Sequence, residues 1–188
     1  MLRFIFLLMF LFVHMGAWSD AYAVEPLDFK GAHFGVSEQQ FLEKHPEFKC
    51  SDAQGSLEIA LSDRTCFLFD TEKGTYAGIP ADLSVGFYAN RMATVGVYFD
   101  SKSFDFVRHA LVKKYGKPSA EETETLTTAT GGEFLNEKSK WNHKDGMILI
   151  RKYAGKITRS KVSLYSVAGF VEMEKRKNEA IKQGGNDL

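Results

Sequence analysis

The strongest constraint on the fold of this chain is a pair of alternating segments between residues 82 and 100. In "DLSVGFY" every second residue is large and apolar, and the alternation returns in "RMATVGVYF" after a turn at residues 89–91. A period of two is the spacing of side chains along one face of a strand. The sequence therefore predicts a hairpin with one buried face. That face consists of Leu83, Val85, Phe87, Ala93, Val95, Val97 and Phe99.

Two helices are predicted, one before and one after this hairpin. The first begins after Ser37, forms a capping box with Gln40 three residues later, and ends before Pro46. The second is capped by Ser103 and stops at Gly116. Apolar residues recur along the second helix at helical spacing. We expect three side chains of the two helices to pack on one face of a sheet, namely Phe41, Leu111 and Tyr115.

The remaining segments predict further short strands and a third helix. Residues 119–133 are interpreted as a loop or a ragged edge strand, with the acidic run "EETE" in solvent. Strands are expected at residues 57–61, 66–69, 138–143, 147–153 and 161–166. This order predicts an α+β fold in which a helix-then-sheet unit is used twice, with the helices packed on one face of an antiparallel sheet. The other face is expected to be open, and such a face can bind a protein or peptide.

The first residues have the three parts of a secretory signal peptide. Arg3 precedes an apolar run at residues 4–13, and Ala21-Tyr22-Ala23 is an A-x-A cleavage site. A membrane anchor would need roughly 20 apolar residues. We expect cleavage after Ala23 and a periplasmic location. The expected organisation is a signal peptide at 1–23, a single α+β domain at 24–166, and a charged helix with a frayed tail at 167–188. The fraying is expected in "QGGNDL", residues 183–188, and the sequence leaves open whether this helix docks on the sheet or projects.

The charge balance of the chain excludes two classes of partner. Lysine and arginine number 24, as do aspartate and glutamate, so the formal net charge is +0. Nucleic-acid binding depends on a basic excess, so no nucleic-acid partner is expected. Nor does the chain have a polybasic patch of the size that holds proteins on anionic membranes. No stable membrane insertion is expected after the signal is removed.

The chain has two cysteines, Cys50 and Cys66. An oxidising compartment favours a disulfide between them. A metal site would need further ligands at suitable spacing, and the histidines are scattered. A catalytic thiol would need an activating partner. His45 is close in sequence to Cys50, but Pro46 breaks any helical face they could share. The disulfide is the favoured interpretation, with the metal and the nucleophile as alternatives.

Three segments carry a resemblance to known proteins: "GAHFGVSEQQFLEKHP", the central hairpin and "FDFVRHALVKKYGKP". They look like small exported Gram-negative proteins of unknown function. The helix-then-sheet plan over residues 28–166 is similar to the β-lactamase-inhibitor-protein-like architecture, which is also found in small outer-membrane assembly lipoproteins. Unlike those lipoproteins, this chain has no cysteine near the expected cleavage site that could be acylated. The resemblance implies a binding role and carries over no active site.

No catalytic motif was found in the sequence, so we expect a protein that is not an enzyme, without cofactor or metal. There is no G-x-S-x-G, no phosphate-binding glycine loop and no H-E-x-x-H. The candidate recognition surface consists of Tyr88, Asn90, Arg91, Tyr98 and Trp141. The alternative for the hairpin residues is that they are ordinary side chains on the exposed face of a strand. The alternative for the tryptophan is a position in the core.

The functional hypothesis is a periplasmic binding or interaction protein, either an envelope accessory factor or an inhibitor, whose partner is another envelope protein. The alternatives are a module that binds a small ligand and, less favoured, a small thiol-dependent enzyme.

Overall fold

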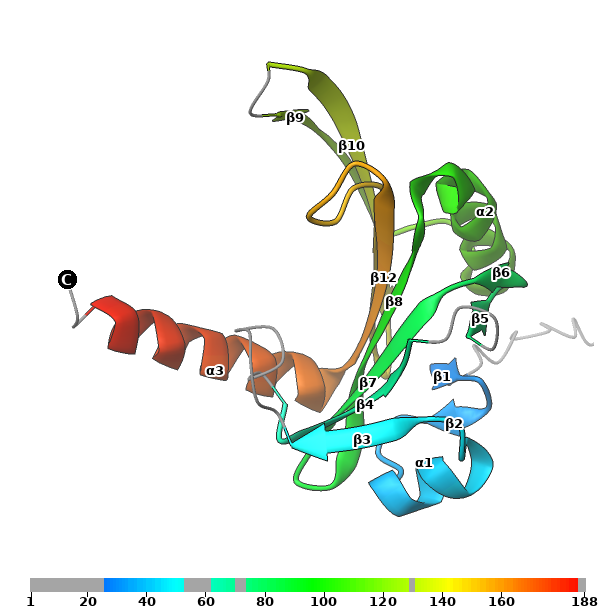
Figure 1. Ribbon diagram of the computed structural model, residues 1–188, viewed down its shortest axis with the longest axis vertical. Helices are drawn as coiled ribbons and strands as arrows, with labels where there is room; N and C mark the ends of the chain where they lie inside the picture. Colours follow the sequence, from blue (N-terminus) through cyan, green and yellow to red (C-terminus); the bar gives the residue numbers. More distant parts are fainter. Residues whose placement is uncertain (1–25, 53–61, 70–73, 129–130, 186–188) are drawn as a thin grey trace, which may run out of the picture.

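The computed structural model describes residues 26–52, 62–69, 74–128 and 131–185. The expected signal peptide and the expected strand at 57–61 lie outside these residues. Within them, an eight-stranded antiparallel sheet is accompanied by three helices, which confirms the α+β class (Figure 1). The strands of this sheet are β3 (Lys49–Asp52), β4 (Arg64–Leu68), β7 (Asp82–Tyr88), β8 (Arg91–Asp100), β9 (Ala120–Thr127), β10 (Glu133–His143), β11 (Gly146–Arg151) and β12 (Arg159–Ser166).

The strand order divides the sheet into two units of similar plan. The order is β3-β4-β7-β8-β12-β11-β10-β9. Helix α1 (Glu38–Lys44) precedes the first four strands in the chain, and helix α2 (Phe104–Tyr115) precedes the last four. The two units meet through their final strands, because β8 pairs with β12 and Val97 lies opposite Val162. The predicted repetition of a helix-then-sheet unit is confirmed.

The hairpin that the alternation predicted is β7 and β8. Ala89 and Asn90 form its turn with φ values of 46° and 58°. Positive φ at both central residues gives the twist that matches two antiparallel strands. All seven apolar residues of the predicted face are buried. Six of them belong to the core on the side of α1 and α2. Ala93 is the exception, because the register shifts at Gly86 and Phe87 so that Met92 pairs with Phe87 and takes the core position, while the Cβ of Ala93 lies against Gly169 of α3.

Helix α1 begins at its predicted capping box. The Ser37 hydroxyl accepts a hydrogen bond from the Gln40 amide, and the Gln40 side chain accepts one from the Ser37 amide. The helix has only seven residues, so packing rather than propensity must hold it. Phe41 provides that packing, with its ring centroid 5.1 Å from that of Phe48 and 5.9 Å from that of Phe87.

Helix α2 follows the prediction at both ends, with one difference in its cap. Ser103 occupies the N-cap position, but its side chain makes no capping hydrogen bond. Asp100 instead accepts a hydrogen bond from the Lys102 amide in a short 3-10 turn, η1 (Ser101–Ser103). Gly116 ends the helix with a φ of 80°, a conformation that favours glycine. Phe104, Val107 and Leu111 are buried, and Tyr115 packs at the edge of the core.

The second unit has one more regular strand than the predicted three-stranded meander. The segment interpreted as a loop or ragged edge strand forms β9, which pairs with β10 over eight residues. Its acidic run is therefore on a strand rather than in a loop. The run is stabilised there by pairing, because Glu124 forms an ion pair with Lys138 and Glu121 with Arg108.

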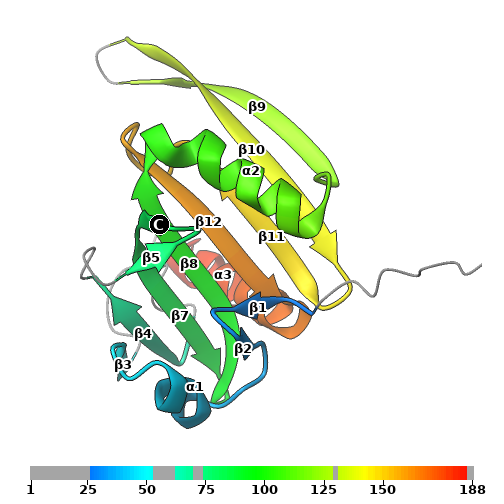
Figure 2. The ribbon, with the colours of Figure 1, turned by 90° about the vertical axis from the view of Figure 1, so that its right-hand side faces the viewer.

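The two faces of the sheet carry different helices. Helices α1 and α2 cover one face, as predicted (Figure 2). Helix α3 (Val167–Gly185), whose docking the sequence left open, leaves the end of β12 on the opposite side (Figure 1). It continues through residues 183–185, which were expected to fray, because extending a formed helix adds one hydrogen bond per residue. Two short hairpins, β1 (Asp28–Phe29) with β2 (Ala32–His33) and β5 (Thr75–Tyr76) with β6 (Ile79–Pro80), complete the described fold.

Candidate functional site

The sheet face opposite α1 and α2, called the open face below, contains a cavity of about 310 Å³. Residues of strands β4, β7, β8 and β12 line it, together with Met173 of α3. Figure 1 shows α3 and the β9–β10 hairpin both projecting on this side of the curved sheet. The cavity volume is at the lower end of the range for ligand sites.

Small residues on the central strands make the floor of this cavity. A Cβ atom on Gly96 would lie 2.6 Å from the Ser84 hydroxyl, so the Ser84 side chain would have to move to admit one. A Cβ atom on Gly86 would likewise meet the Thr94 hydroxyl. The period-two pattern therefore buries large residues against the helices and places small ones on the open face. The cavity exists because nothing large fills this floor.

Aromatic and cationic side chains form the walls. The rings of Phe67 and Phe69 are stacked at 5.0 Å, and Phe69 is 68% exposed. The Tyr98 ring contacts two cations, with the Arg159 guanidinium 4.0 Å and the Lys161 ammonium 4.7 Å from its centroid. Such groups can bind a ligand by stacking and by charge.

Helix α3 is joined to the open face through Arg176. Its guanidinium donates to Asp63 at 2.7 Å and to Glu172 at 2.8 Å, and it lies 4.9 Å from the Tyr88 ring centroid. Burial raises the pKa of Tyr88 to about 12, against the opposing effect of Arg176. The Tyr88 hydroxyl is therefore neutral at physiological pH and can donate a hydrogen bond. Near the start of the helix, the Phe170 ring meets Tyr165 at 6.0 Å.

Acid is expected to loosen the junction between α3 and the sheet. The Ala89 amide at 2.6 Å, followed by Arg176, lowers the pKa of Asp63 below its ordinary 3.8, although burial opposes this. A lowered carboxyl pKa means that the stabilisation is fully present above 3.8 and is lost as the pH falls through the folded value. Asp63→Asn should lower the free energy of unfolding at pH 6 by at most about 1 kcal/mol, because the carboxylate is half exposed.

Urea unfolding of the wild type and of Asp63→Asn between pH 6 and pH 2.5 measures this effect. The difference between the two proteins should shrink as the pH falls below 3.8. A difference that stays constant over this range would mean that Asp63 does not control the junction.

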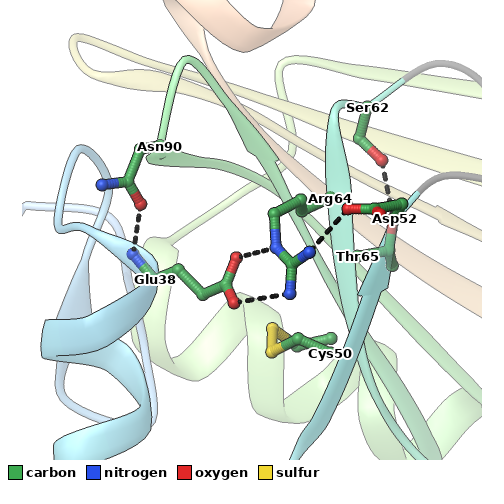
Figure 3. The surroundings of a disulfide bond; sticks show 8 residues. Glu38, Cys50, Asp52, Ser62, Arg64, Thr65 and Asn90 are labelled. Atoms are coloured by element: carbon green, nitrogen blue, oxygen red, sulfur yellow. Dashed lines mark hydrogen bonds and ion pairs between the residues drawn. A yellow bond between two sulfur atoms is a disulfide. The ribbon is translucent and has the colours of Figure 1, made fainter.

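The predicted recognition surface is only partly brought together. Tyr88 and Tyr98 line the cavity. Asn90 instead caps α1, because its side-chain oxygen accepts a hydrogen bond from the Glu38 amide (Figure 3). Arg91 donates to the Gly35 carbonyl at 3.4 Å. These two residues connect the hairpin turn to the α1 region, which a pattern of exposed polar residues does not reveal.

Trp141 is not part of the open face, and its assignment to the recognition surface is corrected. It is 3% exposed, lies on the helix side of β10, and donates its indole N–H to the Gly116 carbonyl at 2.8 Å. The alternative of a core tryptophan is the one observed. The reason is that the carbonyl at the end of α2 gives the indole a partner within an otherwise apolar contact.

Sequence reasoning missed the part of the cavity that β4 and β12 provide. Phe67, Arg159, Lys161 and Tyr165 line it and were not among the predicted residues. The alternation in "RSKVSLYS" placed these β12 side chains opposite the buried ones. It could not show that β12 would lie beside β8.

The disulfide prediction agrees with the structure, in which the sulfur atoms of Cys50 and Cys66 lie at bonding distance. The two residues are directly opposite each other on β3 and β4. Figure 3 shows Arg64 beside them, donating to Glu38 of α1 and to Asp52 of β3. Glu38 and both sulfurs lie within 4.8 Å of one another, but the bonded sulfurs offer no thiolate to a metal or to a substrate.

Among the described residues, no helix combines the length and the apolar character needed to cross a membrane.

No protein-family model matches this chain, and comparisons with curated proteins and with solved structures found no match. The similarity to the β-lactamase-inhibitor-protein-like architecture therefore stays a prediction.

Proposed function

We propose that this chain is an exported, periplasmic binding protein without enzymatic activity, and that its open face holds another protein of the bacterial envelope. The observation that carries the proposal is the cavity on that face, with its floor of small residues and its aromatic and cationic walls. A flat sheet face covered by large polar side chains would have no such recess.

The distribution of large side chains between the two faces of the sheet supports this role. Large apolar residues fill the face under α1 and α2, while the opposite face of the same strands keeps exposed aromatic groups such as Phe69. Aromatic and arginine side chains that remain accessible are the groups that dominate binding at protein interfaces. An envelope protein would place its own apolar side chains in the recess.

A second candidate function is the binding of a small molecule in the same cavity, and its volume of about 310 Å³ favours this. A thiol-dependent reaction is a weaker alternative, because both cysteines take part in the disulfide.

In-cell photo-crosslinking tests the proposal. The full chain, with its leader, is expressed in the bacterium that encodes it with a photoreactive phenylalanine in place of Tyr98. The matched control carries the same group in place of Phe106, which is 59% exposed on α2. We expect a discrete protein adduct from position 98 and none from position 106.

The outcomes separate the candidate functions. An adduct of a few hundred daltons at position 98 would support the small ligand instead of the protein. Equal adducts at both positions, or none at position 98, would contradict a role for the open face. The intact mass of the periplasmic protein, expected to begin at Val24, tests export in the same sample.

A further inference from the structure

Beside the cavity, the open face carries a row of cations at matched positions on neighbouring strands. Tyr98 of β8 lies opposite Lys161 of β12, which lies opposite Arg151 of β11. Arg151 in turn lies opposite Lys138 of β10. Directly paired residues project to the same face of a sheet, so all three cations share the open face with Tyr98. This set of Lys161, Arg151 and Lys138 is called the cationic row below.

Carboxylates flank the cationic row on both sides, because Glu122 of β9 lies directly opposite Lys138 and Asp82 of β7 lies directly opposite Tyr98. Within the row, Lys161 lies opposite Arg151 and Arg151 lies opposite Lys138. Like charges directly opposite each other destabilise a pair of strands, and here the arrangement occurs twice in succession.

Within the described parts of the chain, no carboxylate lies in ion-pair distance of Arg151. Lys138 forms an ion pair with Glu124 and lies opposite Glu122. The pKa of Glu124 is lowered first by its hydrogen bond with Lys138, then by that with Asn136, and also by the nearby Arg151. The three side chains are half-buried, so water screens their repulsion only in part.

We propose that the cationic row binds an acidic segment of a partner protein, which lies across the strands with an adjacent apolar side chain in the cavity. This inference rests on the proposed function of the open face and names the chemistry of the partner. Strand spacing puts the outer two cations roughly 10 Å apart. Two or three carboxylates of an extended segment span that distance.

The shape of the open face selects a protein segment over a lipid surface. The row is carried by β10, β11 and β12, in the part of the sheet from which α3 and the tip of the β9–β10 hairpin project on the same side (Figure 1). A flat bilayer would contact these elements before it reached the row, whereas a single extended chain fits between them. The aromatic walls beside the row give such a segment an apolar contact next to its charges.

Fluorescence anisotropy with a defined probe tests the inference. The probe is a labelled peptide of sequence Leu-Phe-Gly-Asp-Glu-Asp-Glu, and its control replaces the acids by Asn and Gln. We expect the wild-type protein to bind the acidic probe at least about tenfold more tightly than the neutral one. Binding should weaken as salt is raised.

Two protein variants with equal changes in net charge locate the binding. Arg151→Gln with Lys161→Gln should weaken the acidic probe by at least about tenfold. Lys113→Gln with Lys117→Gln, at exposed positions in and just after α2, should leave binding unchanged. Lys161 also lies over the Tyr98 ring, so a melting curve of the first variant is recorded, and binding is measured below its melting temperature. Equal loss of acidic-probe binding in both variants, or full binding by the first variant, would overturn the inference.

The remaining outcomes distinguish a protein segment from a membrane, and the cationic row from the proposed function. Tight binding to vesicles containing phosphatidylglycerol, lost in the row variant and not competed by the acidic probe, would replace the protein segment by a membrane. A protein adduct at position 98 combined with no preference for the acidic probe would overturn the cationic row and leave the proposed function standing. Probe binding that depends on the row, without any adduct at position 98 in cells, would support the row and contradict the envelope partner.

Discussion

Trp141→Ala is expected to lower the free energy of unfolding by about 3 to 5 kcal/mol. The indole is 3% exposed and fills the contact between β10 and the end of α2. Its removal leaves a cavity and takes the hydrogen-bond donor from the Gly116 carbonyl. Chemical denaturation followed by circular dichroism measures the loss.

The matched control for this substitution is Phe106→Ala, another aromatic residue changed to alanine. Phe106 is 59% exposed on α2, so its removal should cost under about 0.5 kcal/mol. Trp141→Ala should still bind the acidic probe at temperatures where it is folded. Loss of binding with unchanged stability would restore Trp141 to the recognition surface, from which its burial removes it.

Removal of the disulfide is expected to cost about 3 kcal/mol in the double variant Cys50→Ala, Cys66→Ala. The cysteines are 16 residues apart, so the bond restricts a loop in the unfolded chain. In the folded chain it connects β3, a four-residue edge strand, to β4. Alanine is preferred to serine because Cys66 is 0% exposed and a hydroxyl there would have to be buried.

Reductant provides the control for this prediction. It should shift the urea midpoint of the wild type to that of the double variant and leave the variant unchanged. Alkylation of both cysteines in the folded, unreduced protein would contradict the bond. A double variant as stable as the wild type would mean that β3 is held by its other contacts, including the ion pair between Arg64 and Asp52.

The local parts of the fold could be predicted because neighbouring residues decide them. The capping box at Ser37 and the stop at Gly116 are interactions within one helical turn. The alternation in β7 and β8 specified which residues face the core, since a slip by one would expose them all. The sequence did not decide whether the β9 segment is a loop or a strand. The reason is that "AEETETLT" has few apolar residues and depends on pairing with β10.

The candidate site was predicted only where it lies on the hairpin. Tyr88 and Tyr98 were found because alternation alone puts them opposite the buried face. The hydrogen bonds of Asn90 and Arg91 to Glu38 and Gly35 could not be predicted, because these partners are more than fifty residues away. Both residues are exposed, and their part in a recognition surface stays a prediction. A polar residue at a turn has the same sequence signature whether it faces solvent or caps a distant helix.

The sequence by itself determined the class of fold, the faces of the central strands and the ends of two helices. Only the tertiary structure decided that β8 lies beside β12, that α3 leaves on the open face, and that three cations from three strands stand in one row. The physical reason is the range of the interactions. Periodicity and capping act over a few residues, whereas strand order and register are selected by burial of the whole core.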